Sequence, residues 1–136
     1  MSIVVSFPAT VENLEKMRSF IAETGLSLCA GDDCLECLVH AVDEAASNII
    51  IHGYKGGPGE IEITVSREGD YLVVCMRDQA PHFNPANYPM PNLTLPLKKR
   101  PLGGLGIYFM RHFTDKMNYR VNEQGENELT LVKKAF

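Results

Sequence analysis

The chain has 136 residues, of which 45% are hydrophobic, and a formal net charge of -4 at pH 7. This length and apolar content predict a single domain, residues 1–136, built around one hydrophobic core. The mildly acidic balance, with residues 98–100 as the only run of three basic side chains, argues against an extended positive surface and therefore against nucleic acid as a partner. No basic leader precedes a cleavage site, and no apolar run could span a bilayer, so we expect a cytoplasmic protein without a membrane partner.

The first half of the chain predicts one strand followed by two helices. Residues 3–7 have the apolar, β-branched composition of a short strand. Thr10 is a candidate N-cap for a helix over about residues 11–23, which Gly25 would end. Asp33 and Glu36 form a capping-box pattern at the start of a second helix that runs toward Gly53. Apolar residues at helical spacing give this second helix its core face: Leu35, Leu38, Val42, Ala45 and Ile49.

The second half predicts four strands, one helix and a long irregular segment. Residues 60–66 alternate apolar and polar side chains, and after a turn residues 71–76 are apolar throughout, which is typical of a central strand. The segment 79–102 contains six of the eight prolines, and long irregular loops in compact domains are often lids. A short helix then runs from about Gly104 to Asp115, and two strands follow, one through residues 117–121 and one through Leu129 and Leu131. This order predicts an α+β fold, a two-layer α/β sandwich in which a mixed, mostly antiparallel sheet carries the helices on one face.

Two polar residues on the second helix are candidates for a binding site. Glu44 and Asn48 are four residues apart, so both would point into the same space, along a stripe of small residues that also includes His52. A stripe of small residues leaves room for a ligand. When this helix is judged alone, the alternative is equally good: Glu44 and Asn48 are two ordinary polar residues at a helix edge and bind nothing.

Asp78 stands where the central strand is expected to end. An acceptor-only carboxylate in this place can receive a hydrogen bond from the amino group of a bound base, and Pro81 and Phe83 offer an apolar surface for a flat ring. Aspartate is also a common turn former, which is the plainer interpretation.

The segment 103–106 (GGLG) precedes a helical run, so its amides and the helix N-terminus would face outward together, as suits a phosphate group. The chain contains no G-x-x-x-x-G-K-[ST] sequence, which excludes a Walker-type loop, and no parallel βαβ unit surrounds the glycines. A glycine pair used only as a hinge is the alternative.

The cysteines offer a rival site. Cys29, Cys34 and Cys37 have the C-x4-C-x2-C spacing of plant-type iron-sulfur ferredoxins, with Cys75 as a candidate fourth ligand. Cys34 and Cys37 nevertheless fall within a predicted helix and Cys75 within an apolar strand, whereas a cluster needs a loop that wraps around it. Four reduced thiols are the interpretation that we favour.

Taken together, three segments resemble the sequence boxes of one family. Residues 44–54 (EAASNIIIHGY) resemble the N box, residues 78–85 (DQAPHFNP) the D-x-G/A-x-x-F box, and residues 103–110 (GGLGIYFM) the glycine box of the histidine-kinase-like ATPases, which share the Bergerat fold. The short chain and the close spacing of the boxes make it most similar to the anti-sigma-factor serine/threonine kinases of bacterial partner-switching systems. Ala80 stands where the family often has glycine. This difference affects the shape that we expect for the adenine pocket.

The resemblance implies ATP and Mg²⁺ as ligands. It gives Glu44 the role of general base, places Asn48 on the metal and Asp78 on the adenine amino group, and puts the phosphates on the glycine turn. The nucleotide site that it implies comprises Asn48, His52, Asp78, Ala80, Phe83, Lys98, Arg100, Gly103, Gly104, Leu105, Gly106, Ile107 and Thr130. For Lys98 and Arg100, a merely solvated basic patch is the plainer interpretation.

The implied function is that of an ATP-dependent anti-sigma factor that phosphorylates a Ser or Thr of a small antagonist protein. Its second client would be a sigma factor, and a homodimer is compatible with the resemblance. The alternative is a non-catalytic binding module that uses ATP only to order the segment 79–102 and so control a partner surface. Glu44 favours the kinase, because a pure nucleotide sensor needs no base.

Overall fold

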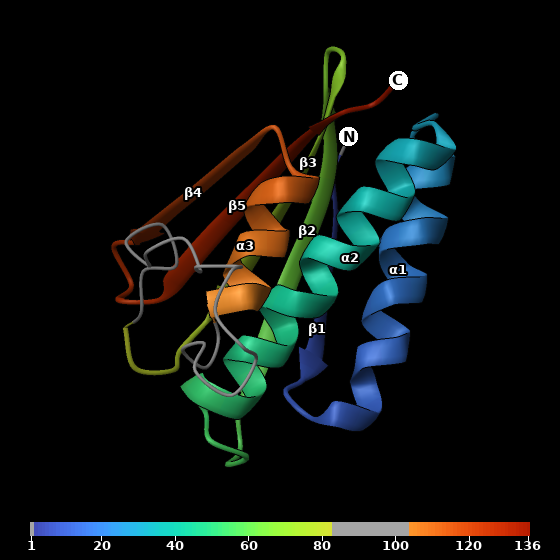
Figure 1. Ribbon diagram of the computed structural model, residues 1–136. Helices are drawn as coiled ribbons and strands as arrows, with labels where there is room; N and C mark the ends of the chain where they lie inside the picture. Colours follow the sequence, from blue (N-terminus) through green and yellow to red (C-terminus); the bar gives the residue numbers. More distant parts are fainter. Residues whose placement is uncertain (1, 83–103) are drawn as a thin grey trace.

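The computed structural model describes residues 2–82 and 104–136, and for residues 104–107 and 109 it describes the backbone alone. The described chain forms a five-stranded sheet with three helices packed on one of its faces (Figure 1). The strands are β1 (Ser2–Pro8), β2 (Glu60–Glu68), β3 (Tyr71–Asp78), β4 (Lys116–Val121) and β5 (Asn127–Lys134), and the α-helices are α1 (Leu14–Ser27), α2 (Asp32–Asn48) and α3 (Gly104–Phe113). This arrangement confirms the predicted α+β sandwich.

The sheet has the strand order β1-β2-β3-β5-β4, and all of these pairings are antiparallel. β3 is therefore the central strand, as its apolar run predicted. Alternate residues of β2 and β3 are fully buried beneath the helices: Ile61, Ile63, Val65, Leu72, Val74 and Met76. Leu38 and Val42 of α2 meet them in the same core cluster, which confirms the predicted core face of this helix. Burying such a side chain stabilises the fold by roughly 1.5–3 kcal/mol, so this contact holds the two layers together.

The ends of the first helix differ from the prediction. A 3-10 turn, Val11–Asn13, precedes α1, and Thr10 makes no side-chain cap to this turn; instead Asn13 Nδ2 donates to Thr10 Oγ1 at 2.8 Å. Gly25 does not end α1, which continues to Ser27. Gly25 is needed for packing, because an added Cβ would lie 2.2 Å from Leu35 Cδ2 on α2.

The start of α2 also differs from the prediction. This helix begins at Asp32 with Gly31 as its N-cap, so Asp33 lies inside the first turn and the predicted capping box with Glu36 is wrong. The two aspartates of the first turn, Asp32 and Asp33, still favour this end of the helix electrostatically, since they face its partial positive charge.

Beyond Asn48, α2 passes directly into one π-helical turn, Ile49–Gly53, in which Tyr54 N donates to Ile49 O at 2.8 Å. Such turns insert one extra residue into a helix and are frequent at functional sites. The predicted continuation of the helix to Gly53 is thus confirmed in extent, but the last turn is wider than an α-helical one. It brings the end of α2 against the end of β3.

Candidate nucleotide site

A cavity of about 240 Å³ lies where the end of α2 and the π-helical turn face the end of β3 and the start of β5. It is mostly apolar, with a few polar side chains, which is the usual character of a small-molecule site. The residues that line it are Ala45, Asn48, Ile49, His52, Gly53, Asp78, Ala80, Pro81, His82, Met110, Tyr119, Asn127 and Leu129. Four of the predicted nucleotide-site residues, Asn48, His52, Asp78 and Ala80, therefore line one cavity.

Asp78 is the last residue of β3 and is only 5% exposed. Its Oδ1 accepts two hydrogen bonds at 2.9 Å, one from Ala80 N and one from Asn127 Nδ2. Within the described residues Oδ2 has no such partner, so this oxygen remains for a ligand. Burial raises the pKa of the Asp78 carboxyl, and the bonds from Asn127 and Ala80 oppose this rise. Asp78 is thus a fixed acceptor at the cavity wall.

Asn127, which the sequence analysis did not single out, holds Asp78 in place. It opposes Asp78 across the β3–β5 pairing and is 6% exposed. Its Nδ2 also donates to Ala80 O at 2.9 Å, and its Oδ1 accepts from Tyr119 OH at 2.5 Å. The only sequence signal for it is the position next to the last predicted strand, because the register that pairs it with Asp78 joins residues far apart in the chain.

Asn48 lies on the last turn of α2 and carries an amide nitrogen that is buried without a hydrogen-bond partner among the described residues. An unpaired buried amide costs about 1–3 kcal/mol, so such a group is expected to meet a ligand or water. His52, one turn further along, is exposed at the rim. Two members of the predicted stripe, Asn48 and His52, therefore line a cavity.

Glu44 is one turn before Asn48 and is half-buried, but it is not among the residues that line the described cavity. Burial raises the pKa of its carboxyl, the nearby charge of Asp43 adds to this rise, and His40 opposes it. A base with a raised pKa is better matched to proton transfer near neutral pH than an ordinary carboxylate. Asp43 itself is held by Arg18 of α1, with 2.5 Å between Oδ1 and Nη1.

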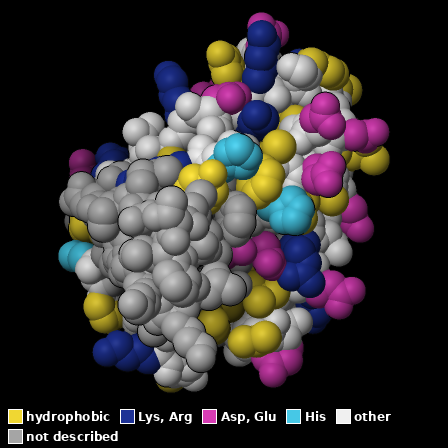
Figure 2. Space-filling model, in the orientation of Figure 1, with side chains coloured by type: hydrophobic (Ala, Val, Ile, Leu, Met, Phe, Trp, Pro, Cys, Tyr) yellow, Lys and Arg dark blue, Asp and Glu magenta, His cyan; other side chains and the backbone are white. Residues whose placement is uncertain are grey.

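The helical surface next to Glu44 combines histidine and aromatic side chains. The His40 ring of α2 stacks on Phe113 of α3 with 5.2 Å between centroids, and His112 contacts Phe113 edge-on. Figure 2 shows histidine and hydrophobic side chains side by side on this face, close to acidic ones. α2 and α3 thus pack together directly beside the candidate site.

Gly53 explains how the site accommodates Ala80. A Cβ added at Gly53 would lie 2.9 Å from Ala80 Cβ, so the bare backbone of the π-helical turn leaves space for the alanine methyl group. Tyr54 fixes the next step of the chain, since its hydroxyl accepts from Gln79 N and donates to Glu60 O, both at 2.8 Å. The alanine that replaces the family's frequent glycine at position 80 therefore faces a residue without a side chain, Gly53.

The predicted phosphate turn is described in part. Gly104 is the first residue of α3, in agreement with the predicted helix start. Leu105, Gly106 and Ile107 form the first turn of this helix, and their side chains lie outside the description. Phe83, Lys98, Arg100 and Gly103 lie outside the described residues, as does the predicted lid from residue 83 onward.

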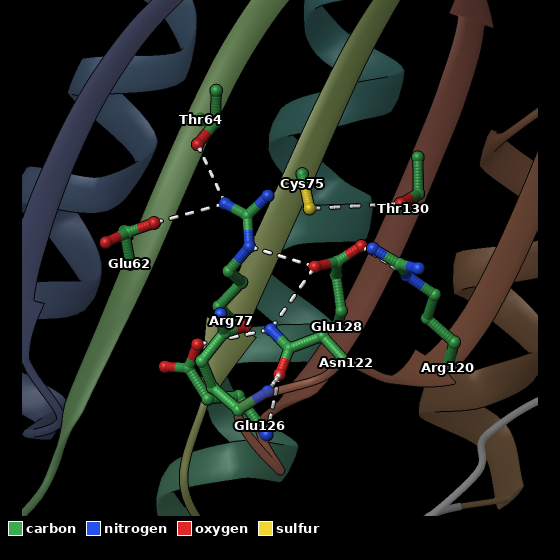
Figure 3. Close-up of polar contacts among 10 residues, drawn as sticks. Glu62, Thr64, Cys75, Arg77, Arg120, Asn122, Glu126, Glu128 and Thr130 are labelled. Atoms are coloured by element: carbon green, nitrogen blue, oxygen red, sulfur yellow. Dashed lines mark hydrogen bonds and ion pairs between the residues drawn. The ribbon is translucent and has the colours of Figure 1, made fainter.

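Thr130 does not join the other predicted site residues. It faces the side of the sheet opposite the helices, where its Oγ1 lies 3.9 Å from Cys75 Sγ (Figure 3). On this open face Arg77, Glu128 and Arg120 also form a row of ion pairs. The placement of Thr130 in the nucleotide site is therefore corrected: the β5 side chain that reaches the cavity beside Asp78 is Asn127.

Two thiols of the rival iron-sulfur interpretation, those of Cys34 and Cys75, lie on opposite sides of the sheet. Cys34 of α2 is buried in the core and its thiol contacts Lys133 O, whereas Cys75 lies on the open face. Burial raises the pKa of the Cys34 thiol to about 11, so this thiol is protonated at neutral pH. Among the described residues no three His, Cys, Asp or Glu side chains are grouped as metal ligands.

Comparison with known proteins agrees with the fold. The profile of the histidine kinase-like ATPase domain matches residues 7–133, and the chain belongs to this family. The chain is similar to the serine-protein kinase RsbW of Bacillus mycoides, with 26% identity over 125 residues, 89% of this chain and 78% of that protein. It is also similar to the anti-sigma F factor of Clostridium kluyveri, with 26% identity over 135 residues, 99% of this chain and 94% of that protein.

A solved structure has the same fold. The crystal structure of the RsbU and RsbW domains of Rv1364c from Mycobacterium tuberculosis matches 98% of this chain with a TM-score of 0.69 and 16% identity. The chain spans 32% of that protein's length. Within the described residues, no helix combines the length and apolar character needed to cross a membrane.

Proposed function

We propose that this protein is an ATP-dependent anti-sigma factor that phosphorylates a serine or threonine of a small antagonist protein. The observation that carries the proposal is that two polar groups at one cavity have no hydrogen-bond partner among the described residues: Asp78 Oδ2 and the buried Asn48 Nδ2. Both groups lie at the ends of regular elements, α2 and β3, and a polar ligand between them would pair with both. An adenine nucleotide with its metal supplies such a ligand.

We expect the two ends of ATP to meet two different elements of the site. Asp78 Oδ2 would accept from the exocyclic amino group of adenine, with Pro81 and Met110 among the apolar lining beside the ring. The phosphates would lie toward the start of α3 at Gly104, because a helix N-terminus favours phosphate through its free amides and its dipole. The match to the histidine kinase-like ATPase domain supports ATP as the nucleotide.

Asn48 is a suitable ligand for Mg²⁺. Mg²⁺ keeps most of its water and phosphate ligands and takes one or two oxygens from the protein, and Asn48 Oδ1 would supply one such oxygen at the cavity wall. When bound, the metal neutralises charge on the phosphates. Asn48 would hold it, and Asp78 would hold the opposite end of the nucleotide.

Glu44 would be the general base. Its carboxylate, on the same side of α2 as Asn48, takes the proton from the acceptor hydroxyl as the hydroxyl oxygen attacks the γ-phosphorus and the bond to ADP breaks. Its raised pKa supports this role, because the proton that it receives is then held more firmly. The names of the relatives, a serine-protein kinase and an anti-sigma F factor, support a protein acceptor and a sigma factor as client.

The test is transfer of labelled phosphate. The purified chain is mixed with ATP labelled on the γ-phosphate, Mg²⁺ and candidate antagonist domains from the same genome, and label on serine or threonine is followed. The proposal predicts transfer to one class of antagonist. Tight ATP binding without transfer to any of them would favour the non-catalytic binding module instead, and absence of ATP binding would reject both.

A further inference from the structure

A chain of three side chains runs along the wall of the cavity and ends at Asp78. Tyr119 on β4 donates to Asn127 Oδ1 at 2.5 Å, and Asn127 on β5 donates to Asp78 Oδ1 at 2.9 Å. All three residues line the cavity. The chain connects the edge strand of the sheet to the residue proposed to bind the base.

The orientation of the Asn127 amide follows from its partners. Its nitrogen lies 2.9 Å from two acceptors, Asp78 Oδ1 and Ala80 O, so the nitrogen must point toward β3 and the oxygen toward β4. Tyr119 OH then has an acceptor in front of it and acts as the donor. Reversing the amide would set its oxygen against two acceptors, so the chain has one stable direction.

We propose that Tyr119 and Asn127 are positioning residues that make the site selective for a 6-amino purine. Asn127 occupies Asp78 Oδ1 with a donor and leaves Oδ2 as an acceptor toward the ligand, while Tyr119 keeps the Asn127 amide in the only orientation that does so. This inference rests on the proposed function, because it specifies how the same site recognises its nucleotide.

The chemistry of the purine 6-position makes the consequence specific. Adenine presents an amino donor there, which pairs with the free carboxylate oxygen, whereas hypoxanthine and guanine present a carbonyl oxygen, which sets acceptor against acceptor. A site built around such a buried polar contact discriminates strongly against an analogue that cannot make it. We therefore expect substitutions that loosen Asp78 to reduce the discrimination between adenine and 6-oxo purines more than they reduce the free energy of unfolding.

The experiment compares ATP with ITP, which differ at the 6-position of the purine, by calorimetric titration of the full chain in the presence of Mg²⁺. Tyr119→Phe removes one hydroxyl and keeps the ring, and Asn127→Asp places a second carboxylate beside Asp78. A second carboxylate disfavours ionisation of Asp78, so Asp78 would be protonated more often, and a proton on its Oδ2 would be a donor for the 6-oxygen of ITP. We expect the ratio of ITP to ATP dissociation constants to fall about tenfold in Asn127→Asp, and by a smaller factor in Tyr119→Phe.

Glu128→Gln is the matched control. Glu128 follows Asn127 on β5 but faces the open side of the sheet, where it pairs with Arg77 and Arg120 (Figure 3), so its loss should lower stability without changing the ratio. An unchanged ratio in both Tyr119→Phe and Asn127→Asp, with parental ATP selectivity intact, would overturn the inference and leave the proposed function standing. Equal binding of ATP and ITP by the parent would also overturn it. If the parent binds no ATP, the proposed function itself fails.

Discussion

Gly53 and Ala80 are in such close apposition that any side chain at Gly53 would have to displace Ala80, because its Cβ would lie 2.9 Å from Ala80 Cβ. The first residue belongs to the π-helical turn after α2 and the second follows β3, so this contact sets the spacing of two walls of the cavity.

The first prediction tests this contact. Gly53→Ala should lower the free energy of unfolding by about 1–3 kcal/mol, as overpacking by one methyl group does. In the Ala80→Gly background the same substitution should be milder by about 0.5 kcal/mol or more, since the opposing methyl is gone. Urea denaturation of the four proteins measures this coupling, and strictly additive effects would show that the two residues do not compete for space.

The second prediction concerns the stability of the empty protein. The pKa of Asp78 is raised above its usual 3.8, so the native state binds more protons than the unfolded state between that value and the raised one. Stability is therefore lost as the pH rises through this window, and the ionised buried carboxylate is a cost at neutral pH. Asp78→Asn keeps an oxygen for the Asn127 and Ala80 donors, and at pH 7 it should unfold at the same or a higher denaturant concentration than the parent.

Asp70→Asn serves as the control for this prediction, since Asp70 is exposed in the turn between β2 and β3. A marked loss of stability in Asp78→Asn at pH 7, with Asp70→Asn unaffected, would mean that ionised Asp78 contributes to the fold rather than to ligand binding.

The third prediction separates chemistry from binding at Glu44. Glu44→Gln should bind ATP within a few-fold of the parent and transfer phosphate about 100-fold to 10,000-fold more slowly, the typical cost of losing a general base. Because the pKa of Glu44 is raised, the parental rate should fall with decreasing pH before an ordinary carboxylate would protonate. Glu36→Gln, two turns earlier and exposed, is the matched variant and should transfer at the parental rate. Parental transfer by Glu44→Gln would assign the proton to another group.

The fourth prediction concerns the open face of the sheet. Glu128 is 8% exposed and accepts from Arg120 at 2.7 Å and from Arg77 at 3.0 Å, and chiefly the bond from Arg120 lowers the pKa of its carboxyl. A lowered native pKa gives stability that is present above the unfolded value and is lost as the pH falls through the native one. Glu128→Gln should therefore be destabilised at pH 7 by about 1–3 kcal/mol. The difference should shrink below about pH 4.5, whereas Glu123→Gln, in the exposed turn, should match the parent at both pH values. A difference that does not change with pH would show that the lost contacts are not ionic.

The strands and the two principal cavity residues could be predicted from sequence because their signals are local. Alternation marks β2, the buried run marks β3, and the boxes around Asn48 and Asp78 place both residues at element ends that meet in this fold. Gly25 was assigned wrongly for a physical reason: glycine usually ends helices, but here its missing side chain admits Leu35 from the neighbouring helix. A tertiary contact overrode the local preference.

The assignment of Thr130 to the site failed on strand parity. Leu129 and Leu131 face the core, and side chains alternate along a strand, so Thr130 must face away from the helices. Asn127 has the correct parity, but its role depends on pairing with a strand that lies 49 residues earlier. No local pattern specifies that register, which is why the residue that anchors Asp78 was missed.

The most direct test of the account is a calorimetric titration of the purified chain with ATP and Mg²⁺, carried out on the parent, Asp78→Asn and Thr130→Ala. The cavity is predicted to be the nucleotide site, so the parent should bind one ATP, Asp78→Asn should bind at least about tenfold more weakly, and Thr130→Ala, on the opposite face of the sheet, should match the parent. No binding by the parent at millimolar ATP, or parental affinity in Asp78→Asn, would contradict the assignment of this cavity to ATP.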